Sequence, residues 1–130
     1  MNEVVDGLPT DYTLHKIEGA KVLNYFFTRY SYFADWLWSN LKKHSSGYKL
    51  VFTGHSLGGA LAVHAITDIM LENIKSASDL KIYTFGHPRV GNKNFEQILR
   101  DRVKDAYWVV HNWDMVAHIP YCVPKVFGST

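Results

Sequence analysis

Residues 48–62, YKLVFTGHSLGGALA, run from a short apolar segment through a glycine-rich turn into a second apolar segment. The β-branched and aromatic residues of Tyr48–Thr53 favour a buried strand, and the alanine- and leucine-rich stretch Ala60–Asn73 favours a helix. Between them, Gly54–Gly59 predicts a tight turn. A strand that passes through Gly-x-Ser-x-Gly into a helix is typical of a nucleophile elbow, so Ser56 is the candidate nucleophile.

Each residue type in this elbow has a chemical reason. The turn is so tight that Ser56 is expected to have a strained backbone, with its hydroxyl exposed above a sheet. Gly54 and Gly58 are expected to be small because strand and helix nearly touch. The backbone N–H of Leu57, at a helix N-terminus, would donate to the negative charge of a tetrahedral intermediate. The alternative, a glycine-rich turn with a solvated serine, leaves the apolar segments on both sides unexplained.

The rest of the chain alternates helix and strand. Apolar residues at three- and four-residue steps predict a helix over Gly19–His44. Further strands are predicted at Leu80–Phe85 and Ala106–His111, with a helix over Asn94–Val103 that Asn92 could cap. This alternation predicts an α/β fold with a mostly parallel sheet flanked by helices. Three strands are few for such a sheet, which suggests part of a larger fold.

Composition places the 130-residue chain among ordinary globular domains, with 47% hydrophobic and 20% charged residues. The formal net charge of +2, with acids and bases interspersed, argues against a nucleic-acid-binding surface. Neither a signal peptide nor an apolar run long enough for a transmembrane helix is visible, and the compartment stays open. Residues 1–18 mix acids with Gly7 and Pro9 and are expected to form an irregular segment.

Three motifs resemble, in order and spacing, those of the class 3 (fungal-type) triacylglycerol lipase family. They are TGHSLGGALA at residues 53–62, YTFGHPRVG at residues 83–91 and HNWDMVAHIP at residues 111–120, with Ala117 where the family usually has proline. The resemblance implies an α/β-hydrolase fold and serine-dependent hydrolysis of lipid esters, without metal or cofactor. It implies a partial lipase-like domain over residues 19–130, lacking early strands and a C-terminal histidine loop, and it favours secretion.

The same resemblance implies that Asp114 is the acid of a catalytic triad. Its position agrees, because Asp114 follows the third predicted strand, and active-site residues gather at the carboxyl edge of a parallel sheet. Its role would be to orient an imidazole and stabilise the imidazolium. The alternative is a helix- or turn-capping aspartate.

The general base is the missing member of this triad. The family places its histidine well downstream of the acid, on a loop that these 130 residues do not contain. His118 matches a family histidine that is not catalytic, His87 follows the second strand, and His55 is expected to pack against neighbouring strands. The second oxyanion donor is likewise expected from an earlier loop that the sequence does not show.

Two hypotheses of function follow. The first is a serine ester hydrolase whose substrate is a lipid ester, working at a possible lipid–water interface. The second is a non-catalytic lipid- or partner-binding protein on a degenerate lipase fold, because fold does not fix function. The aromatic stretch Tyr25–Trp38 could bind lipid, but its helical spacing favours the core. Arg89 is expected to brace a loop, and Cys122 is either half of a disulfide or a buried or free thiol.

Overall fold

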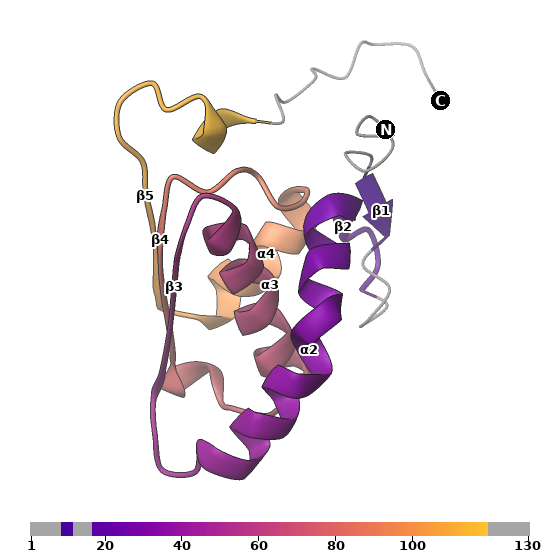
Figure 1. The fold of residues 1–130 in the computed structure, drawn as a ribbon, viewed down its shortest axis with the longest axis vertical. Helices are drawn as coiled ribbons and strands as arrows, with labels where there is room; N and C mark the ends of the chain where they lie inside the picture. The colour runs from indigo at the N-terminus through magenta and orange to yellow at the C-terminus, as the bar shows by residue number, and fades with distance from the viewer. Residues whose placement is uncertain (1–8, 12–16, 120–130) are drawn as a thin grey trace.

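The computed structural model describes residues 9–11 and 17–119, and Cys122 lies outside them (Figure 1). Two strands pair antiparallel in a small ribbon: β1 (Pro9–Asp11) and β2 (Lys21–Leu23). Three parallel strands form the larger sheet, in the order β3 (Leu50–His55), β4 (Leu80–Phe85) and β5 (Asp105–Val109). The parallel sheet predicted from the alternating pattern is confirmed.

In the part of the chain that the structure describes, three helices accompany the strands: α2 (Asn24–His44), α3 (Leu57–Leu71) and α4 (Lys93–Arg102). The same residues also form two short 3₁₀ turns, η1 (Ala77–Asp79) and η2 (Val116–His118). The predicted cap is present, since the Asn92 side chain accepts a hydrogen bond from the N–H of Phe95 at 3.1 Å. No helix of the described residues is both long enough and apolar enough to span a membrane.

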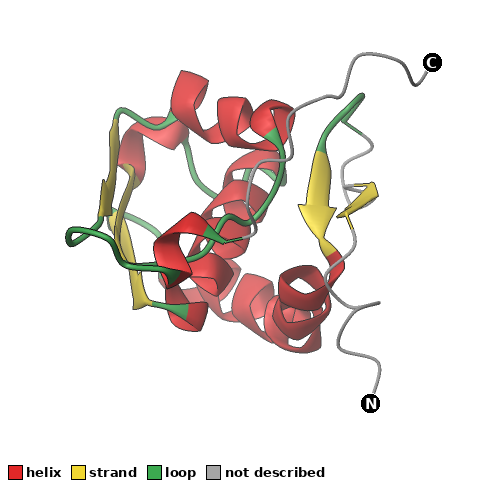
Figure 2. Cartoon of the chain, turned by 90° about the horizontal axis from the view of Figure 1, so that it is seen from above, coloured by secondary structure: helices red, strands yellow, loops and turns green. Residues whose placement is uncertain are grey.

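Helices α2, α3 and α4 lie on one face of the three-stranded sheet (Figure 2). The strand order advances in one direction, and crossovers between parallel strands share one hand, so α3 and α4 fall on the same side. Leu80, Ile82 and Thr84 of β4 are buried toward these helices. The alternating residues Lys81, Tyr83 and Phe85 point to the opposite face, where Phe85 is exposed.

Helix α3 is the centre of the core, packed between the sheet and α2. Ile66 and Ile69 contribute to a cluster with Leu80 and Ile82 of β4. On its other side, Ala65 packs with Tyr30 of α2. Because α3 has neighbours on both sides, it is apolar around most of its circumference, as its sequence requires.

Long-range pairing corrects two predicted boundaries near the N-terminus. The helix predicted from Gly19 begins at Asn24, because Lys21–Leu23 pairs with Pro9–Asp11. The position of Val22 fits the period of a helix and that of a strand, and its pairing with Thr10 across the ribbon selects the strand. For the same reason, the irregular structure expected over residues 1–18 is corrected at Pro9–Asp11, which forms β1.

The aromatic stretch Tyr25–Trp38 divides between the two sides of α2. Phe26 and Tyr30 are buried, as expected for core residues. Tyr32 and Trp36 are 75% and 67% exposed, so the expectation of a core role is wrong for them. The stretch has aromatic residues on more sides of the helix than the core can cover, and spacing alone cannot tell which side is outermost.

Candidate active site

Ser56 connects β3 to α3 in a backbone conformation that residues other than glycine rarely adopt. Its φ is 53° and its ψ is −124°, the strained geometry expected of a nucleophile elbow. Its N–H donates to the carbonyl of Phe85 at 3.0 Å, and its own carbonyl accepts from the N–H groups of Gly59 and Ala60 at 3.0 and 3.2 Å. The elbow is therefore fastened to β4 on one side and to the first turn of α3 on the other.

The predicted turn over Gly54–Gly59 is shorter than expected, and its glycines have different roles. A Cβ on Gly54 would overlap the backbone carbonyl of Gly58, so strand and helix do touch at this point. A Cβ on Gly58 itself would meet nothing within 4 Å, which corrects the expectation that Gly58 must be small. The second close approach falls at Gly59, where a Cβ would lie 2.7 Å from the Cβ of His87.

Asp114 reaches the same edge from the loop that follows β5. Its N–H donates to the carbonyl of His111 at 3.1 Å, and its Oδ1 accepts from the N–H of Val116 at 3.0 Å. Its Oδ2 lies over Gly86, where a Cβ would approach it to 2.6 Å. Gly86 has a φ of 57° and is held by its N–H, which donates to Val109 at 2.9 Å.

Ser56 and Asp114 thus share the carboxyl edge of the sheet, on either side of β4. The strand ends are in register, with His55 beside Phe85 and Phe85 beside Val109. The residues that follow these positions therefore emerge at one level. This is the arrangement expected for a nucleophile and the acid of a triad.

Within residues 17–119, no histidine hydrogen-bonds the Ser56 hydroxyl. The Nδ1 of the exposed His118 is 2.7 Å from the carbonyl oxygen of Asp114, so His118 braces the acid loop from its backbone side. The Nδ1 of His87 is 2.6 Å from the carbonyl oxygen of Pro88, and its ring lies 5.0 Å from that of Trp108. Burial lowers the pKa of His87, which favours the neutral ring.

His55 differs from its expected packing role. It is exposed on the open face of β3. The strand is at the edge of the described sheet and has helices on its other face alone, so a side chain that points away from α3 meets solvent. His55 thus lies across the strand from Gly54 and Ser56, on the side away from the helix.

Exposed apolar side chains border the edge that carries Ser56 and Asp114. Leu57 directly follows the serine, and Trp113 and Met115 flank the aspartate. Trp113 is 92% exposed and Met115 is 71% exposed. Clustered exposed apolar groups of this kind are typical of a binding surface.

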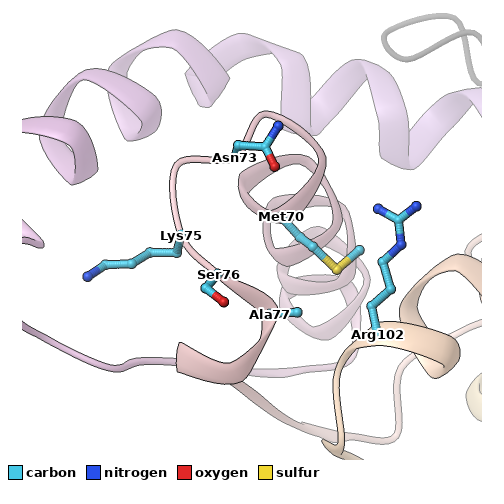
Figure 3. Close-up of a pocket in the computed structure, with 6 residues that line it drawn as sticks. All are labelled: Met70, Asn73, Lys75, Ser76, Ala77 and Arg102. Carbon is cyan, nitrogen blue, oxygen red and sulfur yellow. The ribbon is translucent and has the colours of Figure 1, made fainter.

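Two hollows of the described residues lie at the other end of the molecule, and Figure 3 shows the lining of one of them. One has a volume of about 390 Å³ and is lined by Met70, Asn73, Lys75, Ser76, Ala77 and Arg102. A neighbouring hollow shares Asn73 and Lys75. Both lie at the C-terminal end of α3, whose 15 residues span about 22 Å at 1.5 Å per residue, whereas Ser56 is at its N-terminal end. These hollows therefore do not serve Ser56.

Comparison with known proteins identifies the family. The profile of the class 3 lipases matches residues 2–124. The chain belongs to the class 3 lipase family. A lipase of Rhizopus niveus is 36% identical over 118 residues, which cover 86% of this chain and 29% of that protein. The resemblance inferred from the three motifs is confirmed.

Solved lipase structures agree with the fold of this class 3 lipase chain. The lipase of Rhizopus microsporus var. chinensis superposes with a TM-score of 0.74 and 36% identity, over 87% of this chain and 40% of that one. A triacylglycerol lipase whose catalytic centre is described as a serine protease triad superposes with a TM-score of 0.78 and 33% identity, over 90% of this chain and 45% of that one. The chain spans less than half the length of these relatives.

Proposed function

We propose that this class 3 lipase family member is a serine-dependent carboxylic ester hydrolase that acts on lipids. The observation that carries the proposal is the shared edge, with Ser56 at the strained elbow after β3 and Asp114 on the other side of β4. A serine hydroxyl held in this way can attack an ester carbonyl when a base removes its proton. The structurally similar triacylglycerol lipase with a serine triad supports the same chemistry.

In the proposed reaction, Ser56 Oγ forms a bond with the ester carbonyl carbon, and the alcohol leaves after taking the serine proton through the base. Water then attacks the acyl-serine, which releases the fatty acid and restores the hydroxyl. Leu57 is the first residue of α3, so its N–H has no acceptor within the helix and can donate to the oxyanion.

Asp114 would hold the imidazole of the base. Its Oδ1 is already engaged by the Val116 N–H, whereas its Oδ2 accepts no hydrogen bond from the described residues. Oδ2 is therefore the oxygen that we assign to an imidazole N–H. We propose that the histidine and the second oxyanion donor come from segments outside residues 19–119, in a domain of which this chain forms part.

The substrate class follows from the surroundings of the site. Leu57, Trp113 and Met115 offer exposed apolar surface beside the reacting groups. An acyl chain gains free energy by contact with such side chains, at roughly 25 cal/mol per Å² of apolar surface removed from water. A lipid ester suits this edge better than a small polar ester.

The test is hydrolysis of a short-chain nitrophenyl ester by the whole protein and its variants. Ser56→Ala and Asp114→Asn should each lower kcat by about 10⁴-fold or more, as removal of a triad member does. The exposed Ser46 supplies the matched control, and Ser46→Ala should leave turnover unchanged.

The 130-residue chain by itself should show near-background rates, because it lacks a base that contacts Ser56 in the described residues. Robust turnover by this chain that disappears in His118→Ala would overturn the assignment of the base. Full activity of Ser56→Ala in the whole protein would overturn the proposed function and leave a binding role.

A further inference from the structure

One side of α2 carries a line of aromatic and cationic residues, here named the α2 stripe. Its members follow one another at steps of three, four or seven residues: Tyr25, Arg29, Tyr32, Trp36 and Lys43. Residues at these steps are neighbours on a helix surface. The opposite side of α2, with Tyr30 and Ala34, packs against α3.

The α2 stripe is open to solvent along most of its length. Tyr32 and Trp36 expose 75% and 67% of their surfaces, and Arg29 and Lys43 are also exposed. The Arg29 guanidinium lies 4.7 Å from the centre of the Tyr25 ring, so it sits over an aromatic face.

Charge on this side of α2 is positive. The charged members of the α2 stripe, Arg29 and Lys43, are both cationic, and the first turn of α2 has no acid. Asp35 is also exposed; it projects about 100° around the helix from Trp36 and lies three residues from Tyr32, at the border of the stripe. Along the helix, Arg29 therefore precedes the exposed aromatic pair and Lys43 follows it, and one acid borders the pair.

We propose that the α2 stripe is a docking surface for an anionic lipid bilayer. Tyrosine and tryptophan rings favour the boundary between headgroups and acyl chains, because one end of each ring system is apolar and the other is polar. Arginine and lysine attract anionic headgroups. A helix with both features along one side lies in the plane of a membrane surface.

The shape of this side favours a flat partner over a peptide. Neither of the described hollows is lined by a residue of the α2 stripe. Aromatic anchors of protein partners are usually received in pockets, whereas a convex helix can lie along a bilayer. Charge complementarity then selects a surface rich in anionic lipid.

The position of α2 leaves the catalytic edge free in this contact. Figure 1 shows α2 as the outermost helix, running alongside α3 along the length of the molecule. The edge with Ser56 lies at one end of α3, not on the outer side of α2. Docking through the outer side of α2 would therefore leave this edge uncovered. A role of this surface in lipid hydrolysis rests on the proposed function. Membrane binding itself is measured separately from hydrolysis.

The experiment uses the whole protein and sedimentation with two kinds of vesicle, phosphatidylcholine alone and phosphatidylcholine mixed with phosphatidylserine. One double variant removes the exposed aromatic residues of the surface, Tyr32→Ser with Trp36→Ser. The other removes its cations, Arg29→Gln with Lys43→Gln. Each should weaken binding to the anionic vesicles by roughly tenfold or more. Added salt should weaken vesicle binding by the wild type, and should weaken binding by the Arg29/Lys43 variant less, because that variant lacks the two cations.

Matched controls use exposed residues of the same types elsewhere. Tyr48→Ser, and Lys93→Gln with Lys104→Gln, should bind anionic vesicles like the wild type. All variants should keep the wild-type urea midpoint and turnover of a soluble ester. The proposal is overturned if both double variants bind anionic vesicles like the wild type, or if they change self-association on size-exclusion chromatography and not vesicle binding. Vesicle binding by a protein without esterase activity would contradict the proposed function alone.

Discussion

The carboxylate of Asp114 rests on the Cα of Gly86. A Cβ at that position would lie 2.6 Å from Oδ2, and the φ of 57° already disfavours any other residue there. Gly86 is the residue that follows β4, so the seat of the acid belongs to the strand between the two functional groups. The side chain of Asp114 can occupy its place because Gly86 has none.

Gly86→Ala should therefore displace the Asp114 carboxylate. Because misplacement of about 1 Å at a catalytic group costs roughly 10²-fold in rate, we expect a loss of that order in kcat for ester hydrolysis. The measurement is steady-state kinetics of the whole protein. Gly47→Ala is the matched control, since Gly47 also has a positive φ, of 77°, but a Cβ there meets nothing within 4 Å. Equal kinetic losses in both variants would contradict a specific effect on Asp114.

Gly58 and Gly59 should respond in opposite ways to alanine. Gly58→Ala should keep the free energy of unfolding or raise it by up to about 1 kcal/mol, because alanine is the better helix former and meets no atom. Gly59→Ala should lower it by about 1–3 kcal/mol, since its Cβ would collide with the Cβ of His87. Urea unfolding measures both values. The reverse order would show that the elbow glycines were assigned wrongly.

His64 should make the protein less stable in mild acid. Its ring is fully buried and stacked on Tyr30, and burial lowers the pKa of His64 to about 3. The unfolded chain binds this proton near pH 6.5, so the stabilisation is present above that pH and is lost as the pH falls toward 3. At pH 5 the loss should be about 2 kcal/mol. Burial also lowers the pKa of His87, which adds to the loss in the same direction.

The check is the free energy of unfolding between pH 7 and pH 5. His64→Gln should flatten its dependence on pH, because glutamine does not titrate. His44→Gln, at an exposed position, is the matched control and should leave the dependence unchanged. An equal slope in wild type and His64→Gln would rule out His64 as its source.

The isolated chain should associate through the open face of its sheet. Val51, Phe85, Tyr107 and Val109 are 60%, 45%, 51% and 47% exposed there. Uncovered apolar faces and unpaired strand edges promote association. We expect dye binding and early elution on size-exclusion chromatography, and Val51→Lys with Val109→Lys should reduce both. A monodisperse monomer that binds no dye would contradict this expectation.

Local patterns were sufficient to predict the strands around the elbow and their helices. The strained turn at Ser56 follows from a short motif, because neighbours in the sequence build it, and Asp114 was predicted from its own motif and its place after the third strand. Long-range contacts decided what such patterns leave open. The pairing of Val22 with Thr10 turned a predicted helical start into a strand, and the approach of His87 made Gly59, not Gly58, the glycine that must stay small. Spacing alone also could not show which aromatics of α2 face outward.

The end of β4 positions both functional groups at this edge. Ser56 is tied to Phe85 and Asp114 rests on Gly86, so two consecutive residues locate groups that lie 58 positions apart in the chain. A displacement of that strand carries both groups in the same direction, and their separation changes less than either position does. A change in the loop beyond β5 that leaves Asp114 on Gly86 should therefore preserve the alignment between nucleophile and acid.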